Sequence, residues 1–259
     1  MLPLHGIGVL VTRPEQQAMP LCRLLEAQGA STYRLPAIEI KALGGRRELA
    51  ARLGTLQHFD LIIFMSANAV RYGAALLGEQ RGLNLAAVGP ATARALNQAG
   101  YRVAIQPSQN YDSESLLAQP LLTQPLQRRI LLIKGINGRE LLAQELAQRG
   151  AVVEVAEVYR RKITSPDCST LAALVENFAA GYLKVVVANS LESVKNLLQL
   201  ATPALRLQFD AVHWLLPSQR VAAGARKLQL QAPLLVAESA QDQDLVMALI
   251  RWRSKVSGA

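Results

Sequence analysis

The sequence predicts an α/β protein made of parallel sheets that helices cover on both faces. Short apolar runs, such as Ile130–Ile133 and Val152–Val158, alternate with helical patterns along the whole chain. The runs are predominantly apolar, which is typical of strands buried on both faces of a parallel sheet. A third observation predicts how these elements are grouped: the same strand–helix pattern occurs twice along the chain.

The duplicated design is clearest in residues 130–161, ILLIKGINGRELLAQELAQRGAVVEVAEVYRR, where a strand, a glycine-containing loop, a helix and a second strand follow one another. Residues 9–39 have the same order, and Leu131 and Gly150 each lie 121 positions after Leu10 and Gly29. LIIFMSANAV matches VVVANSLESV at an offset of 124, and AVGPATARA matches LLPSQRVAA at an offset of 128. A slowly growing offset is typical of small loop insertions, so we predict an internal duplication. The alternative is a chance alignment of ordinary strand–helix units.

Length and composition limit the class of protein. The 259 residues, 51% of them hydrophobic, suffice for one large domain or two small ones. We see no apolar segment long enough to cross a bilayer and no signal peptide, so no membrane association is expected. Cys22 and Cys168 do not suggest a disulfide framework, and we expect a reducing, cytoplasmic location.

The net charge of +9 favours an acidic partner, either a nucleic acid or a small polyanion. Nucleic-acid binders usually cluster their basic residues and add exposed aromatic side chains. Here the basic residues are scattered and aromatic residues make up 5% of the chain. Most of these charges are explained as solvated helix faces, and we expect no nucleic-acid partner.

The first half of the chain supplies strands and helices in alternation. Pro14 suits the first turn of the first helix, and Gly29 and Gly100 are natural helix ends. Pro36 marks a hinge or a crossing between domains. The expected strands are Gly8–Val11, Thr32–Leu35, Ala37–Ile40, Leu61–Phe64, Leu85–Val88 and Val103–Ile105, and the expected helices begin near Pro14, Arg46, Ser66, Pro90 and Asp112.

The second half repeats this alternation from Ile130. The polar, turn-rich passage Arg160–Asp167 reads as the return crossing, and the last helix begins in acidic and ends in basic residues, as the helix dipole favours. The expected elements are strands Ile130–Ile133, Val152–Val158, Lys184–Ala188, Val212–Leu216 and Leu234–Ala237, with helices after Gly138, over Ser169–Phe178, over Leu191–Leu200, from Ser218 and from Asp242.

Small and hydroxylic residues follow most of the predicted strands. In a parallel α/β sheet, ligands bind outside the carboxyl ends of the strands, and helix N-termini there present free N–H groups that bind anions. Ordinary N-capping by Ser, Thr and Asn is the simpler explanation for any one of these positions. The candidate contacts are Thr12, Arg13, Ser66, Ala67, Asn68, Gly89, Thr92, Lys134, Gly135, Arg139, Ser190 and Ser218.

The sequence lacks several motifs. It has no Gly-x-Gly-x-x-Gly after a strand, no phosphate-binding Gly-x-x-x-x-Gly-Lys-Ser/Thr loop and no Cys-x-x-Cys, and its three histidines lack ligand spacing. We therefore expect no metal and a site that works by positioning and electrostatics. Tyr159 is a distinctive polar aromatic at the predicted crossing, for which core packing with a bonded hydroxyl is the alternative.

Taken together, the motifs resemble those of the uroporphyrinogen-III synthase family. Their order and spacing cover essentially the whole chain, although no single motif is specific. The matching segments are LVTRP at Leu10–Pro14, LEAQGA at Leu25–Ala30 with Pro36 downstream, IIFMSANAV at Ile62–Val70, AVGPATARAL at Ala87–Leu96, KGINGRELLAQELAQRGA at Lys134–Ala151 and VYRR at Val158–Arg161.

The resemblance implies two flavodoxin-like domains joined by a two-stranded linker, one domain made from both chain ends and the other from the middle. We place the discontinuous α/β domain at residues 1–36 and 163–259, the inserted domain at 40–158, and the linker strands at 37–39 and 159–162.

The implied reaction closes the linear tetrapyrrole hydroxymethylbilane, inverts its last ring and releases water, with no metal or organic cofactor. The family's tyrosine falls on Tyr159, which becomes the candidate catalytic residue, and its hydroxy residues fall on Ser66, Thr92 and Ser190. This chain departs from the family where Met65 and Asn189 precede the serines and where Arg220 takes the place that Thr92 has in the other half. The enzyme that makes hydroxymethylbilane is a further expected partner, and we expect a monomer.

Two other functions stay open at this point. A two-lobed binding protein for an anionic metabolite, without catalysis, agrees with the lack of a strong acid–base pair. A nucleic-acid binder is less favoured, and its affinity would fall steeply with salt.

Overall fold

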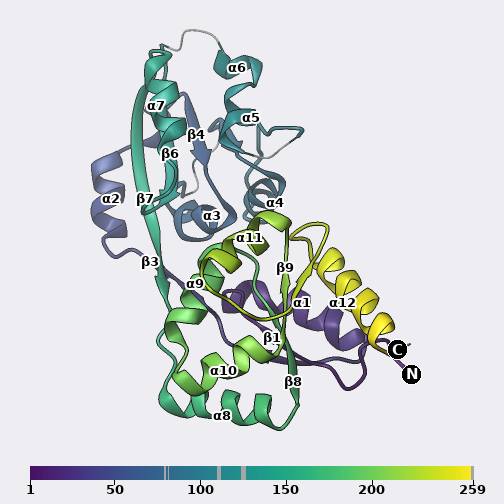
Figure 1. Ribbon diagram of the computed structural model, residues 1–259. Helices are drawn as coiled ribbons and strands as arrows, with labels where there is room; N and C mark the ends of the chain where they lie inside the picture. The colour runs from purple at the N-terminus through teal and green to yellow at the C-terminus, as the bar shows by residue number, and fades with distance from the viewer. Residues whose placement is uncertain (79, 81, 110–111, 124–126, 258–259) are drawn as a thin grey trace. The chain divides into compact units, whose positions relative to one another are not determined.

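The computed structural model describes residues 1–259 except 79, 81, 110–111, 124–126 and 258–259 (Figure 1). The chain forms two compact units: residues 1–39 with 162–259, called unit 1, and residues 40–161, called unit 2. Each unit is built around one of the two five-stranded sheets, and the pairs described below are parallel. The predicted α/β class with parallel sheets is confirmed.

The sheet of unit 1 has the strand order β10-β9-β8-β1-β2. Neighbouring strands are parallel throughout. All four residues of β1, which lies between β8 and β2, are buried. The strands are β1 (Gly8–Val11), β2 (Ser31–Arg34), β8 (Leu183–Val187), β9 (His213–Leu216) and β10 (Leu234–Val236).

Helices cover the two faces of this sheet. On one face α1 packs against α12 over Val9, Val185 and Leu215. On the other, the rings of Phe178 from α8, Phe209 from α10 and Trp214 from β9 meet edge to face. The helices of unit 1 are α1 (Glu15–Ala27), α8 (Cys168–Ala179), α9 (Leu191–Leu200), α10 (Pro203–Ala211), α11 (Gln219–Lys227) and α12 (Asp242–Ser257).

The sheet of unit 2 has the order β3-β7-β6-β4-β5. Strands β7, β6, β4 and β5 are parallel neighbours, and their central members are apolar and buried. The strands are β3 (Ile38–Ala42), β4 (Leu61–Phe64), β5 (Leu85–Ala87), β6 (Arg129–Gly135) and β7 (Val152–Ile163).

Two clusters of apolar side chains bury the faces of this second sheet. Helices α3 and α4 pack on the face of Phe64 and Ile133, whereas α5 and α7 pack on the face of Ile63 and Leu132. The helices of unit 2 are α2 (Arg46–Leu53), α3 (Ala67–Gly73), α4 (Pro90–Gln98), α5 (Ser113–Leu117), α6 (Pro120–Thr123) and α7 (Leu141–Gln148), with 3₁₀ turns at Leu56–His58 and Ala74–Leu76.

Some expected elements differ in the structure. The polar passage after Tyr159 is not all turn, because β7 continues to Ile163. The expected strand Val103–Ile105 is reduced to one bridge, between Ala86 and Ile105. Helix α10 was not expected, although Thr202 caps it and Pro203 occupies its first turn. None of the described helices combines the length and apolar character needed to cross a membrane.

Candidate functional site

Ser66 and Tyr159 form a hydroxyl pair at the carboxyl end of the unit 2 sheet. Ser66 follows β4 and caps α3, where its Oγ accepts a hydrogen bond from the Ala69 N–H at 3.0 Å. Serine is favoured at this position because its side chain satisfies an N–H that the helix leaves free. The same Oγ lies 3.1 Å from the Tyr159 hydroxyl oxygen, so one helix start holds both hydroxyls.

Tyr159 reaches this position through an irregularity in the sheet. Along β6 and β7, Lys134 is paired with Glu157, but the next residue, Gly135, is paired with Tyr159 instead of Val158. Such a shift turns two successive side chains to one face, and both Val158 and Tyr159 lie in the same apolar cluster. Tyr159 is only 6% exposed, so its ring is part of the core while its hydroxyl has a polar partner.

The loop after β6 is closed by its own polar contacts. The Gly138 N–H donates to the Gly135 carbonyl at 3.1 Å, and Asn137 has the left-handed φ of 58° that Asn tolerates well. Lys134, only 7% exposed, donates from Nζ to the Gly138 carbonyl at 3.3 Å and lies 4.0 Å from a Glu157 oxygen. The sequence analysis predicted only a glycine-containing loop here, although the dipeptide Asn137-Gly138 is typical of such a turn.

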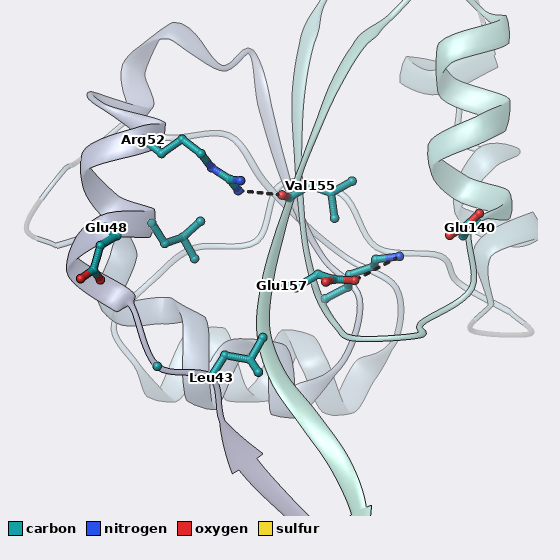
Figure 2. Close-up of a pocket in the computed structure, with 9 residues that line it drawn as sticks. Leu43, Glu48, Arg52, Glu140, Val155 and Glu157 are labelled. Carbon is teal, nitrogen blue, oxygen red and sulfur yellow. Dashed lines mark hydrogen bonds and ion pairs between the residues drawn. The ribbon is translucent and has the colours of Figure 1, made fainter.

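Lys134 also lines a pocket in unit 2, with a volume of about 580 Å³ (Figure 2). Arg52 reaches across from α2 and donates to the Val155 carbonyl at 3.3 Å. The lining of the pocket carries charges of both signs, because three glutamates lie beside Arg52 and Lys134. Its walls are Leu43, Gly44, Glu48, Leu49, Arg52, Lys134, Glu140, Val155 and Glu157.

The remaining candidates of unit 2 lie at helix starts. Ala67 and Asn68 form the first turn of α3, and Gly89 is the N-cap of α4. Thr92 lies in the first turn of α4 and is 4% exposed. Arg139, which follows the β6 loop, is exposed and lies 3.7 Å from Glu114.

In unit 1, the candidates after β1 have partners within the protein. Thr12 is fully buried, and its hydroxyl donates to the Val187 carbonyl at 2.8 Å, which joins the ends of β1 and β8. Arg13 forms an ion pair with Asp242 at the start of α12 and donates to the Ala240 carbonyl at 3.0 Å. Sequence patterns could not indicate Asp242 as this partner, because the two residues are 229 positions apart.

Two serines cap helices after the next strands of unit 1. Ser190 follows β8, accepts from the Ser193 N–H at 3.1 Å and lies 3.0 Å from the Ser193 hydroxyl. Ser218 follows β9 and caps α11. Next to Ser190, the Asn189 Oδ1 is buried and has no hydrogen-bond partner among the described residues.

The predicted residues thus fall into two sets, each at the carboxyl end of one sheet. The unit 2 set contains the Ser66–Tyr159 pair, the α4 start and the β6 loop, and the unit 1 set contains the starts of α9 and α11 with Arg13. Within the described part of the chain, no three His, Cys, Asp or Glu side chains are grouped as a metal would require. These sets can bind anions through helix-start N–H groups and offer one phenol and several alcohols for hydrogen bonding.

Comparisons with known proteins point to one family. A family model described as uroporphyrinogen-III synthase HemD matches residues 20–247. A uroporphyrinogen-III synthase of Escherichia coli (strain K12) is 31% identical over 254 residues, covering 94% of this chain and 100% of that protein. One of Salmonella typhimurium is 32% identical over 255 residues, with the same coverage.

Solved structures agree in fold. A mutant uroporphyrinogen III synthase from Thermus thermophilus matches with a TM-score of 0.57 and 23% identity, over 98% of this chain and 100% of that one. The uroporphyrinogen-III synthetase of Helicobacter pylori 26695 matches with a TM-score of 0.57 and 14% identity, over 96% of this chain and 99% of that one.

Proposed function

The chain belongs to the uroporphyrinogen-III synthase family, and we propose that it closes hydroxymethylbilane with Tyr159 assisting the departure of the substrate's hydroxyl group. Membership makes it a cyclising hydro-lyase of tetrapyrrole biosynthesis. A non-catalytic binding protein for an anionic metabolite is not favoured, because relatives over most of the chain are enzymes of this name.

Substrate binding, in our proposal, depends on many weak anion contacts. Hydroxymethylbilane carries many carboxylates, which suits the net charge of +9 and the helix-start N–H groups at the ends of both sheets. Each unit supplies part of the set. Unit 1 supplies Arg13, Ser190 and Ser218, and unit 2 supplies Ser66, Ala67, Asn68, Gly89, Thr92, Lys134, Gly135 and Arg139. Thr12 is left out of the proposed set, because its hydroxyl is buried and donates to the Val187 carbonyl.

The observation that carries the proposal for Tyr159 is its hydroxyl, 3.1 Å from Ser66 Oγ at the carboxyl end of the sheet. Hydroxide is a poor leaving group, so a hydrogen-bond or proton donor beside the departing oxygen lowers the barrier. A phenol can act in this way without holding a fixed charge.

The first step in this mechanism breaks the bond between the terminal methylene carbon and its hydroxyl oxygen. The oxygen leaves as water with a proton donated from the enzyme side, and the remaining carbon is a cation conjugated with its pyrrole ring. That pyrrole ring delocalises the positive charge, so the enzyme has to supply only part of the barrier reduction. Ser66, held by the Ala69 N–H, keeps the phenol oriented before and after the step.

Tyr159→Phe tests this role. The variant should fold and bind substrate but lose turnover by about 10²-fold, the usual scale for removing a general acid. Tyr72→Phe is the matched control, because Tyr72 lies beside Tyr159 with ring centroids 5.9 Å apart but donates its hydrogen bond to the Ile40 carbonyl. Turnover is measured at saturating hydroxymethylbilane with spontaneous closure subtracted, and the product isomer is identified after oxidation. Near-normal turnover of Tyr159→Phe would show that the phenol only packs.

We also propose that the two units are duplicated, flavodoxin-like domains. Matching β1 with β6, β2 with β7, β8 with β4 and β9 with β5, as the sequence repeat does, gives the orders β2-β1-β8-β9 and β7-β6-β4-β5. Both orders place the repeated units at equivalent positions, which supports a common origin. In the same proposal, residues 37–39 and 159–162 link a domain of residues 1–36 and 163–259 to one of residues 40–158.

Three further expectations complete the proposal. We propose a monomer that works in the cytoplasm and receives its substrate from the enzyme that makes hydroxymethylbilane. Cys22 and Cys168 are both free, which agrees with a reducing compartment. Sedimentation of the protein alone and mixed with that enzyme checks the oligomeric state and the contact.

A further inference from the structure

We infer that Gly135 is a positioning residue for Tyr159: the absence of a side chain at Gly135 makes room for the phenol ring. This inference rests on the proposed role of Tyr159. A Cβ atom added at Gly135 would lie 2.5 Å from the Tyr159 Cζ, 2.7 Å from Cε2 and 2.9 Å from Cε1. These separations are far shorter than any carbon–carbon contact that packed side chains tolerate.

The backbone at Gly135 does not itself require glycine. Gly135 is absent from the described residues with positive φ, so its conformation is open to an alanine. The three atoms nearest to the added Cβ all belong to the Tyr159 ring. The ring is therefore what excludes a side chain at this position.

Neither the Gly135 backbone nor the Tyr159 side chain is free to move away from the other. The Ile136 N–H donates to the Tyr159 carbonyl at 2.9 Å, and the Gly135 carbonyl accepts from the Gly138 N–H at 3.1 Å, so both backbones are held. The ring itself is buried and has Tyr72 beside it at 5.9 Å between centroids. A methyl group at Gly135 must then push the ring sideways.

Displacement of the ring would break the geometry at its far end. The Tyr159 hydroxyl lies 3.1 Å from Ser66 Oγ, and Ser66 is fixed at 3.0 Å by the Ala69 N–H and cannot follow. A shift of about 1 Å at a catalytic group can cost on the order of 10²-fold in rate. Gly135 therefore acts on turnover through the phenol.

The test is the turnover of Gly135→Ala, which we expect to fall at least about tenfold, toward the rate of Tyr159→Phe, with KM nearly unchanged. Gly73→Ala is the control for strain in the same core, because its added Cβ would lie 2.6 Å from Ile133 Cγ2 and 3.3 Å from Val158 Cγ2, and none of the three nearest atoms belongs to the phenol ring. The double variant Gly135→Ala/Tyr159→Phe should be no slower than Tyr159→Phe alone. Normal turnover of Gly135→Ala, or a double variant slowed further by the full Gly135→Ala factor, overturns the inference.

A spectroscopic readout separates this inference from the proposed chemistry. With ¹³C-labelled tyrosine, the Tyr159 Cζ resonance is assigned by its loss in Tyr159→Phe, and it should shift much more in Gly135→Ala than in Gly73→Ala. If the resonance shifts while Tyr159→Phe keeps its turnover, Gly135 seats the ring and the catalytic role of Tyr159 fails. If the resonance stays in place while Tyr159→Phe is slow, the role of Tyr159 stands and the inference fails.

A stability measurement covers the case in which Gly135→Ala does not fold. In a Tyr159→Leu background the ring is gone, so Gly135→Ala should fold and destabilise the protein much less than it does beside tyrosine. An alanine that prevents folding in both backgrounds is excluded by something other than the ring, and the inference is then wrong.

Discussion

At the scale of single residues, the predicted hydroxyl contacts have different structural duties. Ser66 and Ser190 cap helices with hydroxyls at the carboxyl ends of the sheets, whereas the Thr12 hydroxyl is buried and donates to the Val187 carbonyl. A hydroxyl that caps a helix can still form a further hydrogen bond with a ligand. A buried hydroxyl that already bonds a neighbouring strand cannot. The sequence alone could not separate the two, because both occur directly after a strand.

Ser190→Asp distinguishes capping from substrate contact. Aspartate caps helices about as well as serine, so the free energy of unfolding should change by less than about 1 kcal/mol. The added negative charge should repel the substrate carboxylates and raise KM several-fold, since like charges about 4 Å apart in water cost about 1 kcal/mol. Urea unfolding and steady-state kinetics give the two values. An unchanged KM would remove Ser190 from the proposed contacts, and Ser190→Ala serves as the uncharged control.

Thr12→Val should lower the stability of the protein without changing KM, which is the opposite of what we expect for Ser190→Asp. Removing the hydroxyl leaves the buried Val187 carbonyl without this donor, and the free energy of unfolding should fall by about 1–2 kcal/mol. KM should stay near the wild-type value, because a fully buried side chain offers nothing to a ligand. A rise in KM without a loss of stability would restore Thr12 as a contact.

At the scale of elements, β9 begins with a histidine that makes unit 1 sensitive to acid. His213 packs against Trp252 of α12, with ring centroids 4.7 Å apart and the ring planes tilted by 51°, and burial lowers the pKa of its imidazole from 6.5. The unfolded chain therefore binds a proton more readily than the folded one. The resulting stability is present above pH 6.5 and is lost as the pH falls through the lower pKa of the folded state.

His213→Phe should keep the ring contact with Trp252 and remove this titration. The free energy of unfolding of the wild type should fall more steeply below pH 6.5 than that of the variant. Urea unfolding over a series of pH values compares the slopes. Parallel profiles for the two proteins would mean that His213 does not contribute to the acid sensitivity.

The sequence predicted most elements well, but it could not indicate the end of β7 or the contact between Ser66 and Tyr159. The apolar runs and the glycine stops predicted the central strands and most helices, since burial on both faces leaves a clear pattern. The polar end of β7, Arg160–Ile163, has no such pattern, because its strand conformation comes from continuing a paired strand. The Ser66–Tyr159 contact could not be predicted either. Strict alternation would turn Val158 and Tyr159 to opposite faces of the sheet, and only the register shift places the Tyr159 side chain on the face where it meets Ser66.

At the scale of the whole molecule, the two units differ in how the chain builds them. Unit 2 is one continuous stretch with its own sheet and two apolar clusters, whereas unit 1 is assembled from both ends of the chain. A segment of residues 38–163, which contains all of β3 to β7, should therefore fold alone. Circular dichroism should show a single cooperative urea transition for this segment, and a gradual loss of signal would contradict independent folding. The shorter segment of residues 43–163, which lacks β3, is the control that tests whether this edge strand is needed for folding.

The strand order of unit 1 has a consequence for synthesis on the ribosome. Strand β1 lies between β2 and β8, and β8 begins at Leu183, far behind Val11 at the end of β1. At translation rates of roughly 5–20 residues per second, β1 waits about 10 to 30 seconds for its second neighbour. During that interval its apolar edge is unpaired, while unit 2 has emerged and can already fold. The N-terminal strand of this protein is thus open, during synthesis, to premature pairing and to capture by chaperones in the cell.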